Sequence, residues 1–331
     1  MIEFISPAQI KQFVRDQLST GPILLKPMSG GLLNQNVLVT SADAKFVVKV
    51  YRPEMNREKV DEMHRLMAHC AKRGIPVCLP CKQSEVDGFV LAAYPFTEGQ
   101  HPPRHRKTQE TIAEMGAMLG RIDKALDAFR PKEERPASLA PTKYDPTVLL
   151  QRINELRQIL LGKSVSLRRE VNANLDVYEK LTQELDWPDQ GFADLPLRVC
   201  HGDFHGYNIL MREGKIDAVL DWEKSGWDWR GFELMRSILF NCRYDEGRLS
   251  WPLIETYIKA YRNAGSVLSS LECSLAFECG FRRTFFSLWA IKRYIDGNAD
   301  IRGHVIRRIK LFVNLAKHRA EYAERTADLL K

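Results

Sequence analysis

A short segment in the second half of the chain carries side chains that could do chemistry together. It reads His201-Gly-Asp203-Phe-His-Gly-Tyr-Asn208-Ile-Leu, and a second aspartate, Asp221, follows thirteen residues after the asparagine at the end of an apolar run. A carboxylate can orient and deprotonate a hydroxyl group, while carboxylate and amide oxygens are suitable ligands for Mg²⁺. These are the groups that a metal-assisted phosphoryl transfer requires, with Asp203 as the base and Asn208 and Asp221 as metal ligands.

The sequence between the two metal ligands predicts a β-hairpin. Apolar runs at 209–211 and 216–220 flank a Glu213-Gly214 turn, so the chain folds back on itself. Asn208 then lies at the entrance of the hairpin and Asp221 at its exit, where both can reach one metal. Each residue alone could be an ordinary turn or cap residue, but the whole set favours a functional site.

An earlier hairpin carries a lysine in the middle of a strand. β-Branched runs at 37–40 and 45–51 flank a short polar turn, and Lys49 lies inside the second run. Such a lysine either reaches solvent from an edge strand or has a partner, because burial of an unpaired ammonium group is costly. Gly30 and Gly31 precede the hairpin, and glycines let backbone N–H groups approach phosphates closely.

A helix is predicted over residues 54–73, where apolar residues recur at helical spacing. Glu58 and Glu62 lie one turn apart on another face, and either could pair with Lys49 or belong to a solvated acidic face. Strands predicted at 77–79 and 88–95 would complete a small antiparallel sheet with this one long helix.

The polar, proline-containing stretch 97–107 lacks an apolar period and marks a predicted boundary between two lobes. We assign residues 1–96 to an N-terminal lobe and 97–331 to a C-terminal lobe. The second lobe is predicted to be mainly helical, with helices around 112–122, 148–161, 171–185, 274–295 and 305–323.

The composition is that of an ordinary globular protein, with 331 residues, 44% hydrophobic residues and a formal net charge of +7. No apolar run approaches the roughly 18 residues of a spanning helix, and no motif interleaves aromatic and basic residues as nucleic-acid-binding modules do. Seven cysteines, an odd number, do not indicate a secreted disulfide framework. We therefore expect a cytoplasmic protein with neither a membrane nor a nucleic-acid partner.

The motif His201-Gly-Asp203-x4-Asn208, followed by Leu220-Asp221-Trp222-Glu223, resembles the aminoglycoside phosphotransferase and choline kinase family. These proteins are relatives of protein kinases in which the catalytic loop reads His-Gly-Asp. The resemblance covers most of the chain, including Gly30-Gly31, Lys49 and the segment 89–99, where the family has its adenine-contacting hinge. It implies an α+β, protein-kinase-like bilobal fold, with a small antiparallel-sheet N-lobe and a mainly helical C-lobe, that uses ATP and Mg²⁺.

The resemblance also implies roles for single residues. Lys49 would contact the nucleotide phosphates, Glu62 would position Lys49, and His201 would orient the catalytic loop. The positions assigned to nucleotide binding are Gly30, Gly31, Lys49, Glu62, Ala93, Tyr94 and Phe96, the last three through backbone groups around the adenine. Where the family often has aspartate this chain has Glu233, which we interpret as a residue that stabilises the loop rather than as a metal ligand.

In the family the acceptor sits against the C-terminal lobe, so residues after Asp221 are expected to hold specificity. Trp222, Glu223, Trp227, Asp228 and Trp229 place three indoles and two carboxylates within eight residues. This composition could stack on and hydrogen-bond a sugar or hold an ammonium group, although we expect at least one of the indoles in the core.

The predicted function is therefore ATP-dependent phosphorylation of a hydroxyl group on an aminoglycoside, an amino sugar or an amino alcohol. Lys and Arg outnumber Asp and Glu toward the C-terminus, whereas a pocket for a polycationic aminoglycoside is expected to be acidic, so this excess argues against a highly charged aminoglycoside as the acceptor. The alternatives are a kinase of the same fold that acts on homoserine or on protein Ser/Thr, and a pseudokinase that binds nucleotide without turnover.

Overall fold

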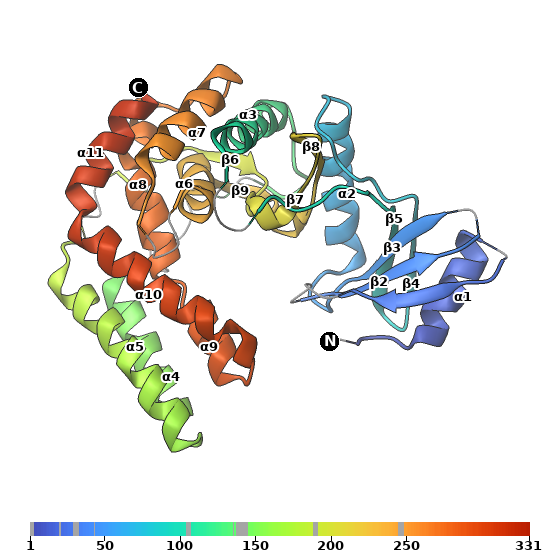
Figure 1. Ribbon diagram of the computed structural model, residues 1–331, viewed down its shortest axis with the longest axis horizontal. Coiled ribbons are helices and arrows are strands. Elements are labelled where there is room, and N and C mark those ends of the chain that lie inside the picture. Colours follow the sequence, from blue (N-terminus) through green and yellow to red (C-terminus); the bar gives the residue numbers. More distant parts are fainter. Residues whose placement is uncertain are drawn as a thin grey trace. The chain divides into compact units, whose positions relative to one another are not determined.

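The computed structural model describes residues 3–19, 21–28, 33–42, 44–103, 107–134, 136, 145–187, 191–243 and 248–331. The predicted phosphate-contacting residues Gly30 and Gly31 lie outside the described residues. The chain divides into two compact units, whose elements are labelled in Figure 1. Unit 1 comprises Met1–Pro102, Ala128–Glu133 and Tyr207–Ser225; unit 2 comprises Pro103–Asp127, Glu134–Gly206 and Gly226–Lys331.

Unit 1 is built on a five-stranded antiparallel sheet with strand order β1-β2-β3-β5-β4 (Figure 1). Its elements are α1 (Pro7–Gln17), β1 (Leu24–Pro27), β2 (Gln35–Thr40), β3 (Lys45–Val50), α2 (Arg57–Ala71), β4 (Lys82–Val86), β5 (Phe89–Pro95), β7 (Ile209–Arg212) and β8 (Lys215–Val219). Buried residues of α1 pack with alternate residues of β2, β3 and β5 to form the core, so one face of the sheet is covered by this helix.

Local sequence signals explain both helices of unit 1. Ser6 caps α1: its hydroxyl accepts from the Gln9 N–H, and the Gln9 side chain accepts from the Ser6 backbone N–H, so the two residues form a capping box. Asn56 caps α2 by accepting from the Lys59 N–H at 3.0 Å. Gly74, with φ +76°, follows the end of α2, where a left-handed residue is needed to turn the chain.

The strand predicted at 77–79 differs in the structure. Only Val77 makes a bridge there, to Val219, and the sheet strand is β4, further along the chain. Pro80 lacks an N–H and interrupts pairing, while β4 reads Lys-Gln-Ser-Glu-Val on the sheet edge and so carries no apolar alternation.

The hairpin predicted around Glu213-Gly214 is confirmed as β7–β8, in which Ile209 pairs with Val219. The Leu220 N–H donates to the Asn208 carbonyl at 2.8 Å, which closes the open end of the hairpin. Gln100 and Met211 exchange backbone hydrogen bonds of 2.9 and 2.7 Å, and a Cβ at the neighbouring Gly99 would come within 2.9 Å of Leu210 Cβ. This close approach packs the β7–β8 hairpin against the end of Met1–Pro102, the first segment of unit 1.

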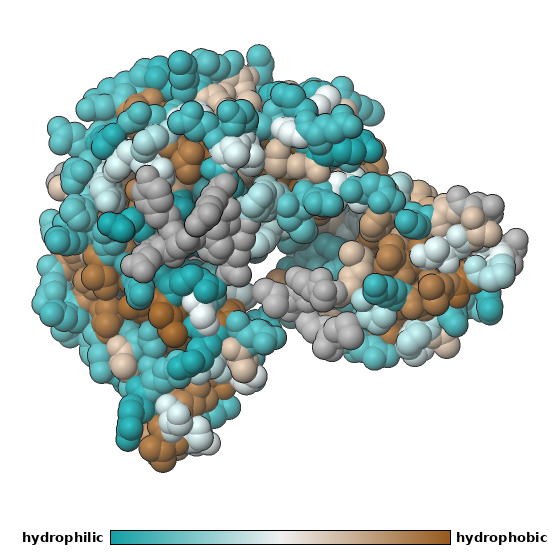
Figure 2. Space-filling model, in the orientation of Figure 1, coloured by the Kyte–Doolittle hydropathy of each residue, from teal (hydrophilic) through white to brown (hydrophobic). Residues whose placement is uncertain are grey.

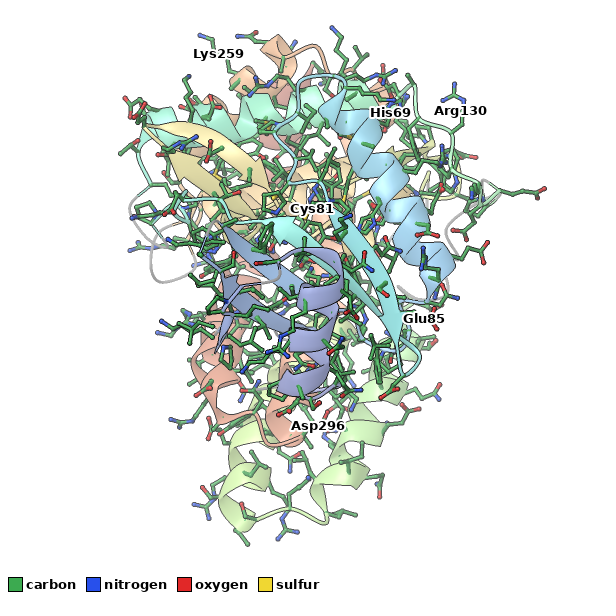
Figure 3. The ribbon with its side chains drawn as sticks, turned by 90° about the vertical axis from the view of Figure 1, so that its right-hand side faces the viewer. His69, Cys81, Glu85, Arg130, Lys259 and Asp296 are labelled. Carbon is green, nitrogen blue, oxygen red and sulfur yellow. The ribbon has the colours of Figure 1, made fainter. Side chains whose placement is uncertain are left out.

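Residues 128–133 join unit 1 because they pack against α2. The Phe129 ring meets the His69 ring edge-on at a centroid distance of 5.1 Å, and the Arg65 guanidinium lies 4.3 Å from the centroid of the same ring. Arg65 Nη2 also donates to the Arg130 carbonyl at 2.6 Å, and His69 and Arg130 are labelled at this end of α2 in Figure 3.

Unit 2 is mainly helical and has one short two-stranded sheet. Its elements are α3 (Gln109–Leu126), α4 (Pro146–Leu160), α5 (Val165–Glu184), β6 (Leu197–Cys200), β9 (Gly226–Trp229), α6 (Arg230–Asn241), α7 (Trp251–Asn263), α8 (Ser270–Phe285), α9 (Trp289–Ile295), α10 (Arg302–Lys317) and α11 (Arg319–Leu330). The helices predicted at 274–295 and 305–323 are each divided in two, at 286–288 and at His318. Gly116 and Gly120 of α3 allow its backbone to contact the carbonyls of Tyr257 and Tyr261 in α7, where a Cβ would clash.

The surfaces are polar with scattered apolar side chains, as the face drawn in Figure 2 shows. Within the part of the chain that the structure describes, none of the helices combines the length and the apolar composition needed to cross a bilayer.

Candidate active site

Lys49 lies in an ionic cluster in unit 1. Its strand turns Lys49 to the face of the sheet opposite α1, where Nζ is 2.8 Å from Glu223 Oε1 and 3.7 Å from Asp221 Oδ1. Glu223 also accepts from Arg52 and from the Asn34 amide, and its side chain is only 4% exposed. The mid-strand lysine therefore has the buried acidic partner that its position requires.

The cluster keeps both partners charged. Burial by itself would lower the pKa of Lys49, but the charges of Glu223 and Asp221 outweigh it and raise that pKa above the ordinary value. Burial would raise the pKa of Glu223, but Lys49 and Arg52 lower it below the ordinary value. Lys49 thus presents an ammonium group and Glu223 a carboxylate at neutral pH.

Glu223, not Glu62, is the carboxylate that holds Lys49, which corrects the predicted pairing. The Glu62 carboxylate accepts from Arg65 Nε at 2.8 Å and Nη2 at 2.6 Å, and from the Lys132 N–H at 2.9 Å. These contacts turn Glu62 toward residues 128–133. Glu223 lies 174 residues after Lys49, so no helical or strand period could connect the two.

The residue that α2 directs toward the sheet beside Lys49 is His64. Its Nε2 is 2.7 Å from the Tyr94 hydroxyl, which also contacts the Tyr51 hydroxyl, and its Nδ1 is 2.7 Å from Gln83 Oε1. Burial lowers the pKa of His64 and raises that of Tyr94, so both are neutral near pH 7. Gln83 continues the chain of hydrogen bonds to Asp61 at 2.7 Å.

The segment predicted to hold adenine lies at the end of β5. The Ala93 carbonyl accepts from the Cys81 N–H at 2.8 Å, and the Phe96 N–H donates to the Lys45 carbonyl at 3.1 Å. Tyr94 is on the same sheet face as Lys49, since Val47 pairs with Tyr94 and Lys49 with Ala92. The contacts of this segment with a nucleotide stay a prediction.

Asn208 and Asp221 come together at the open end of the β7–β8 hairpin, as the spacing predicts. Asp221 has φ 59° and ψ 63°, a left-handed conformation that is uncommon for a residue other than glycine and is tolerated by aspartate. Such conformations concentrate at functional sites. The Asp221 side chain is 42% exposed, so its carboxylate is accessible to a cation.

In unit 2, the loop that follows β6 carries Asp203 and is clamped by Glu233. Glu233 accepts from the His201 N–H at 3.0 Å and from the Gly202 N–H at 2.6 Å, and the Asp203 N–H donates to His201 Nδ1 at 3.2 Å. The interpretation of Glu233 as a residue that stabilises the loop is thus confirmed. Burial and the charge of Asp123 raise the pKa of Glu233 to about 8, against the effect of the two N–H donors.

Arg236 contacts the predicted base directly. Its Nε lies 2.8 Å from Asp203 Oδ1 and its Nη2 contacts the same oxygen, while His205 Nε2 is 3.3 Å away. The His205 ring stacks on Phe240 at a centroid distance of 4.7 Å, and the Arg236 guanidinium lies 5.2 Å from the centroid of that ring. The sequence signal for this group is the spacing of residues 233, 236 and 240, which places them on one face of α6.

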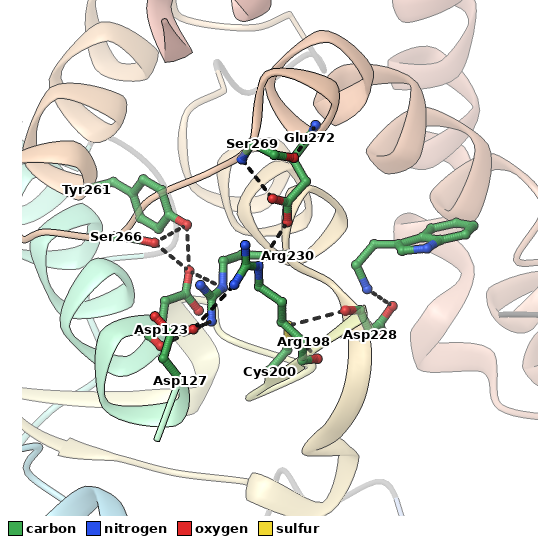
Figure 4. A network of polar contacts seen from close by, with 11 residues as sticks. Asp123, Asp127, Arg198, Cys200, Asp228, Arg230, Tyr261, Ser266, Ser269 and Glu272 are labelled. Carbon is green, nitrogen blue, oxygen red and sulfur yellow. Dashed lines mark hydrogen bonds and ion pairs between the residues drawn. The ribbon is translucent and has the colours of Figure 1, made fainter. Parts of the chain in front are cut away.

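A buried polar network supports the elements on both sides of this loop (Figure 4). Arg230, at the start of α6, donates to the Asp123 carbonyl at 3.1 Å and lies 3.4 Å from its carboxylate, which also accepts from Tyr261 and Ser266. Arg198 of β6 lies 3.5 Å from Glu272. Because Arg230 and Asp123 are each 1% exposed, this pairing fixes α6, and with it Glu233 and Arg236, within unit 2.

The residues predicted for acceptor binding are spread over both units. Trp222 is 1% exposed and donates from Nε1 to the Val219 carbonyl at 3.0 Å, so its indole belongs to the core of unit 1. Its neighbour Glu223 belongs to the ionic cluster around Lys49. Trp229 is also buried, which confirms the expectation of at least one core indole. In unit 2, Trp227 is partly buried and Asp228 contacts Arg283 and the Trp229 N–H.

Known proteins resemble this chain in sequence and in fold. The model of the phosphotransferase enzyme family (APH) matches residues 24–268. Homoserine kinase from Chelativorans sp. (strain BNC1) is 25% identical over 224 residues, which are 66% of this chain and 64% of that protein. Homoserine kinase from Zymomonas mobilis subsp. mobilis is 24% identical over 267 residues, 78% of each chain. The solved structure of amicoumacin kinase hAmiN in complex with AMP-PNP, Ca²⁺ and Ami superposes with a TM-score of 0.63 at 12% identity and 94% coverage of both chains.

The structural similarity confirms the predicted α+β, protein-kinase-like fold, with a small antiparallel sheet and a mainly helical part. The family model covers the predicted lysine, the catalytic loop and the second aspartate together. The chain therefore belongs to the phosphotransferase enzyme family and is a small-molecule O-phosphotransferase that uses a hydroxyl group as acceptor.

Proposed function

We propose that this protein transfers the γ-phosphoryl group of ATP, with Mg²⁺, to a hydroxyl group of an aminoglycoside, an amino sugar or an amino alcohol. The observation that carries the proposal is the cluster of Lys49, Glu223 and Asp221, with Asn208 at the same end of the β7–β8 hairpin. An ammonium group fixed by one buried carboxylate, beside a second, exposed carboxylate, suits a triphosphate with its metal ion.

Unit 1 would bind the nucleotide. Lys49 would contact phosphate oxygens, helped by backbone N–H groups at Gly30 and Gly31, and the backbone near Ala93, Tyr94 and Phe96 would contact adenine. The amide and carboxylate oxygens of Asn208 and Asp221 form a donor set that fits a hard divalent cation. Bound there, Mg²⁺ would neutralise charge that develops on the phosphate oxygens.

Unit 2 would supply the base. Asp203 would accept the proton of the acceptor hydroxyl as its oxygen bonds to the γ-phosphorus and the bond from that phosphorus to the bridging oxygen of ADP breaks. His201, Gly202 and Glu233 would hold the loop that carries Asp203. In this proposal residues 1–96 serve the nucleotide, and the acceptor site lies in 97–331 near Trp227 and Asp228.

A second acceptor, homoserine, is favoured by one specific observation. The matching proteins named above are homoserine kinases, at 24% and 25% identity. Homoserine combines a primary hydroxyl, an ammonium group and a carboxylate. A protein Ser/Thr acceptor and a pseudokinase keep the same fold, but the presence of Lys49, Asp203, Asn208 and Asp221 favours turnover over mere nucleotide binding.

The test is ADP release with Mg²⁺-ATP and a panel of hydroxyl acceptors that includes aminoglycosides, amino sugars, amino alcohols and homoserine. Wild-type protein should release ADP only with a small acceptor, and Asp203→Ala should lower kcat by about 10²–10⁴-fold while ATP binding is retained. Asp300→Ala, an exposed aspartate of unit 2, is the matched control. Phosphate that appears only on protein, or turnover that persists in Asp203→Ala, would overturn the proposal.

A further inference from the structure

Two cations of unit 1 share one buried carboxylate. Lys49 Nζ lies 2.8 Å from Glu223 Oε1, and Arg52 Nη1 contacts the second oxygen, Oε2. Lys49 belongs to β3 and Arg52 follows the end of that strand, whereas Glu223 comes from the turn after the β7–β8 hairpin. The Glu223 carboxylate therefore faces two positive charges, and each of its oxygens has a cation of its own.

A ring of hydrogen bonds fixes Arg52 beside this carboxylate. The Asn34 side chain donates from Nδ2 to Glu223 Oε1, and its Oδ1 accepts from the Arg52 N–H at 3.0 Å. Asn34 is 8% exposed and the Glu223 side chain 4%, so the ring is largely shielded from water. Polar groups in such surroundings interact more strongly than they would in water. Arg52 is therefore an integral part of the cluster rather than a solvated surface cation.

The charge that this cluster presents depends on Arg52. Lys49 and Arg52 carry two positive charges, while Glu223 and Asp221, which lies 3.7 Å from Lys49, carry two negative charges. Asp221 is a proposed metal ligand, so its charge would face a divalent cation bound there. The other three groups then have two positive charges and one negative charge, which leaves +1. Without Arg52 the remaining pair would have no net charge.

Neighbouring side chains do not alter this balance. Burial raises the pKa of Tyr51 and of Tyr94 and lowers that of His64, so these three residues are neutral near pH 7. Glu54 lies 3.7 Å from Arg52, but its side chain is 73% exposed, and water and salt screen an exposed charge. The attraction of the cluster for an anion is therefore set mainly by Lys49, Glu223 and Arg52.

We propose that Arg52 is a positioning residue for the nucleotide phosphates, an inference that rests on the proposed nucleotide site of unit 1. Glu223 holds Lys49 in place, but its negative charge opposes the attraction between Lys49 and a phosphate. Arg52 compensates that charge from Oε2 and leaves the contact of Lys49 with Oε1 intact. The ligand class is a nucleoside polyphosphate, and the contribution of Arg52 acts on its phosphates and not on its base or ribose.

The first experiment separates phosphate recognition from support of the fold. Isothermal titration calorimetry gives the Kd of Mg²⁺-ADP and, in competition with it, the Kd of adenosine. Arg52→Gln should weaken ADP binding about tenfold, because it removes one charge from a partly buried cluster, and should change the Kd of adenosine less than about twofold. Equal weakening of both ligands, or of neither, would overturn the inference.

Two further variants assign the effect to the charge at this position. Arg52→Lys keeps the charge and loses the guanidinium geometry, so it should bind ADP within about threefold of wild type. Arg57→Gln removes a positive charge from α2, where Arg57 is 52% exposed and pairs with Asp61, and it should leave both Kd values unchanged. A loss of ADP affinity in either variant as large as in Arg52→Gln would refute a specific role of the Arg52 charge.

A double variant gives the most demanding test. Arg52→Gln combined with Glu223→Gln removes one charge of each sign, so Lys49 again supplies a net +1. The double variant should therefore bind ADP at least about threefold more tightly than Arg52→Gln alone. Equal or weaker binding would contradict the compensation of Glu223 by Arg52.

These measurements need no acceptor and no turnover. If the wild type binds ADP but phosphorylates no acceptor, the proposed function fails, while the Kd values still decide the role of Arg52. Failure of the wild type to bind ADP would overturn both the proposed function and the inference. Turnover in the wild type together with an unchanged ADP affinity in Arg52→Gln would overturn the inference alone.

Discussion

Glu223→Gln is the substitution that most directly tests the ionic cluster in unit 1. The glutamate carboxylate bonds Lys49 at 2.8 Å, together with Arg52 and the Asn34 amide. Glutamine preserves the shape and one acceptor oxygen, but its amide N–H groups face the guanidinium or the ammonium group, which can only donate. The substitution therefore removes the charge and leaves at least one cation without its closest acceptor.

The expected loss follows from burial. Removing one partner of a fully buried ion pair typically costs about 3–5 kcal/mol. Glu223 is 4% exposed, but Lys49 and Arg52 are 19% and 23% exposed, and each keeps a second carboxylate at 3.7 Å, from Asp221 and Glu54. Water and these carboxylates recover part of the loss, so we expect destabilisation by about 2–3 kcal/mol near neutral pH.

The pH dependence of this loss has a definite sign. Lys49 and Arg52 lower the pKa of Glu223 below its ordinary value of 4.5 against the effect of burial. A lowered folded-state pKa contributes stability above the unfolded-state value, and this contribution is lost as the pH falls through the folded-state value. Urea unfolding of wild type and Glu223→Gln should therefore differ most near neutral pH and converge as the pH falls through the lowered pKa of Glu223.

The matched control is Glu54→Gln. Glu54 contacts the same arginine at 3.7 Å, but its side chain is 73% exposed, and exposed ion pairs contribute about 0–1 kcal/mol. The two glutamates thus differ in burial while sharing a partner. If Glu223→Gln costs no more than Glu54→Gln, or if its cost does not depend on pH, the cluster does not stabilise unit 1 as its geometry implies.

Two further predictions concern unit 2. Because the pKa of Glu233 is raised from 4.5 to about 8, its contribution to stability is complete below about pH 4.5 and is lost as the pH rises through about 8. Glu233→Gln should flatten this fall of the melting temperature between about pH 5 and 9, and a parallel curve would contradict the assigned pKa. Arg236→Lys should lower kcat about tenfold to a hundredfold with little change in the KM for ATP, since an ammonium group cannot reproduce the two N–H contacts to Asp203. Added guanidinium ion should partly restore kcat in Arg236→Ala, whereas a kcat equal to that of wild type in both variants would exclude a positioning role.

The loop that carries the predicted base and the hairpin that follows it were predictable because their information is local. Asp203, Asn208 and Asp221 follow one another within nineteen residues, and a single turn at Glu213-Gly214 is enough to bring the last two together. The role of Glu233 in holding the loop that carries Asp203 could also be predicted, because Glu233 stands at a recognisable position where the family often has an aspartate. The backbone N–H groups that it binds belong to the motif itself.

The partner of Lys49 was not predictable because it depends on tertiary packing. The apolar period of α2 identifies the face of the helix that is buried. It does not identify which polar residues beside that face point toward Lys49. In the structure Glu62 lies on the flank toward residues 128–133, and His64 takes the side toward Tyr94. The sequence instead predicts an acceptor contact for Glu223, because its neighbours Trp222 and Trp227 give the segment the composition of a binding surface.

Glu223 and Glu233 show how identical side chains ten residues apart acquire opposite charge states from their surroundings. Glu223 meets Lys49 and Arg52, so the cations lower its pKa in spite of burial. Glu233 meets backbone N–H groups and the charge of Asp123, and burial then raises its pKa to about 8. A fall in pH through the pKa of Glu223 should therefore weaken unit 1, and a rise in pH from about 4.5 through about 8 should weaken unit 2 through Glu233. The chain passes from one unit to the other between Ser225 and Gly226. The summed contribution of the two glutamates to stability should be greatest near their ordinary pKa of 4.5, because Glu223 contributes fully above that value and Glu233 below it.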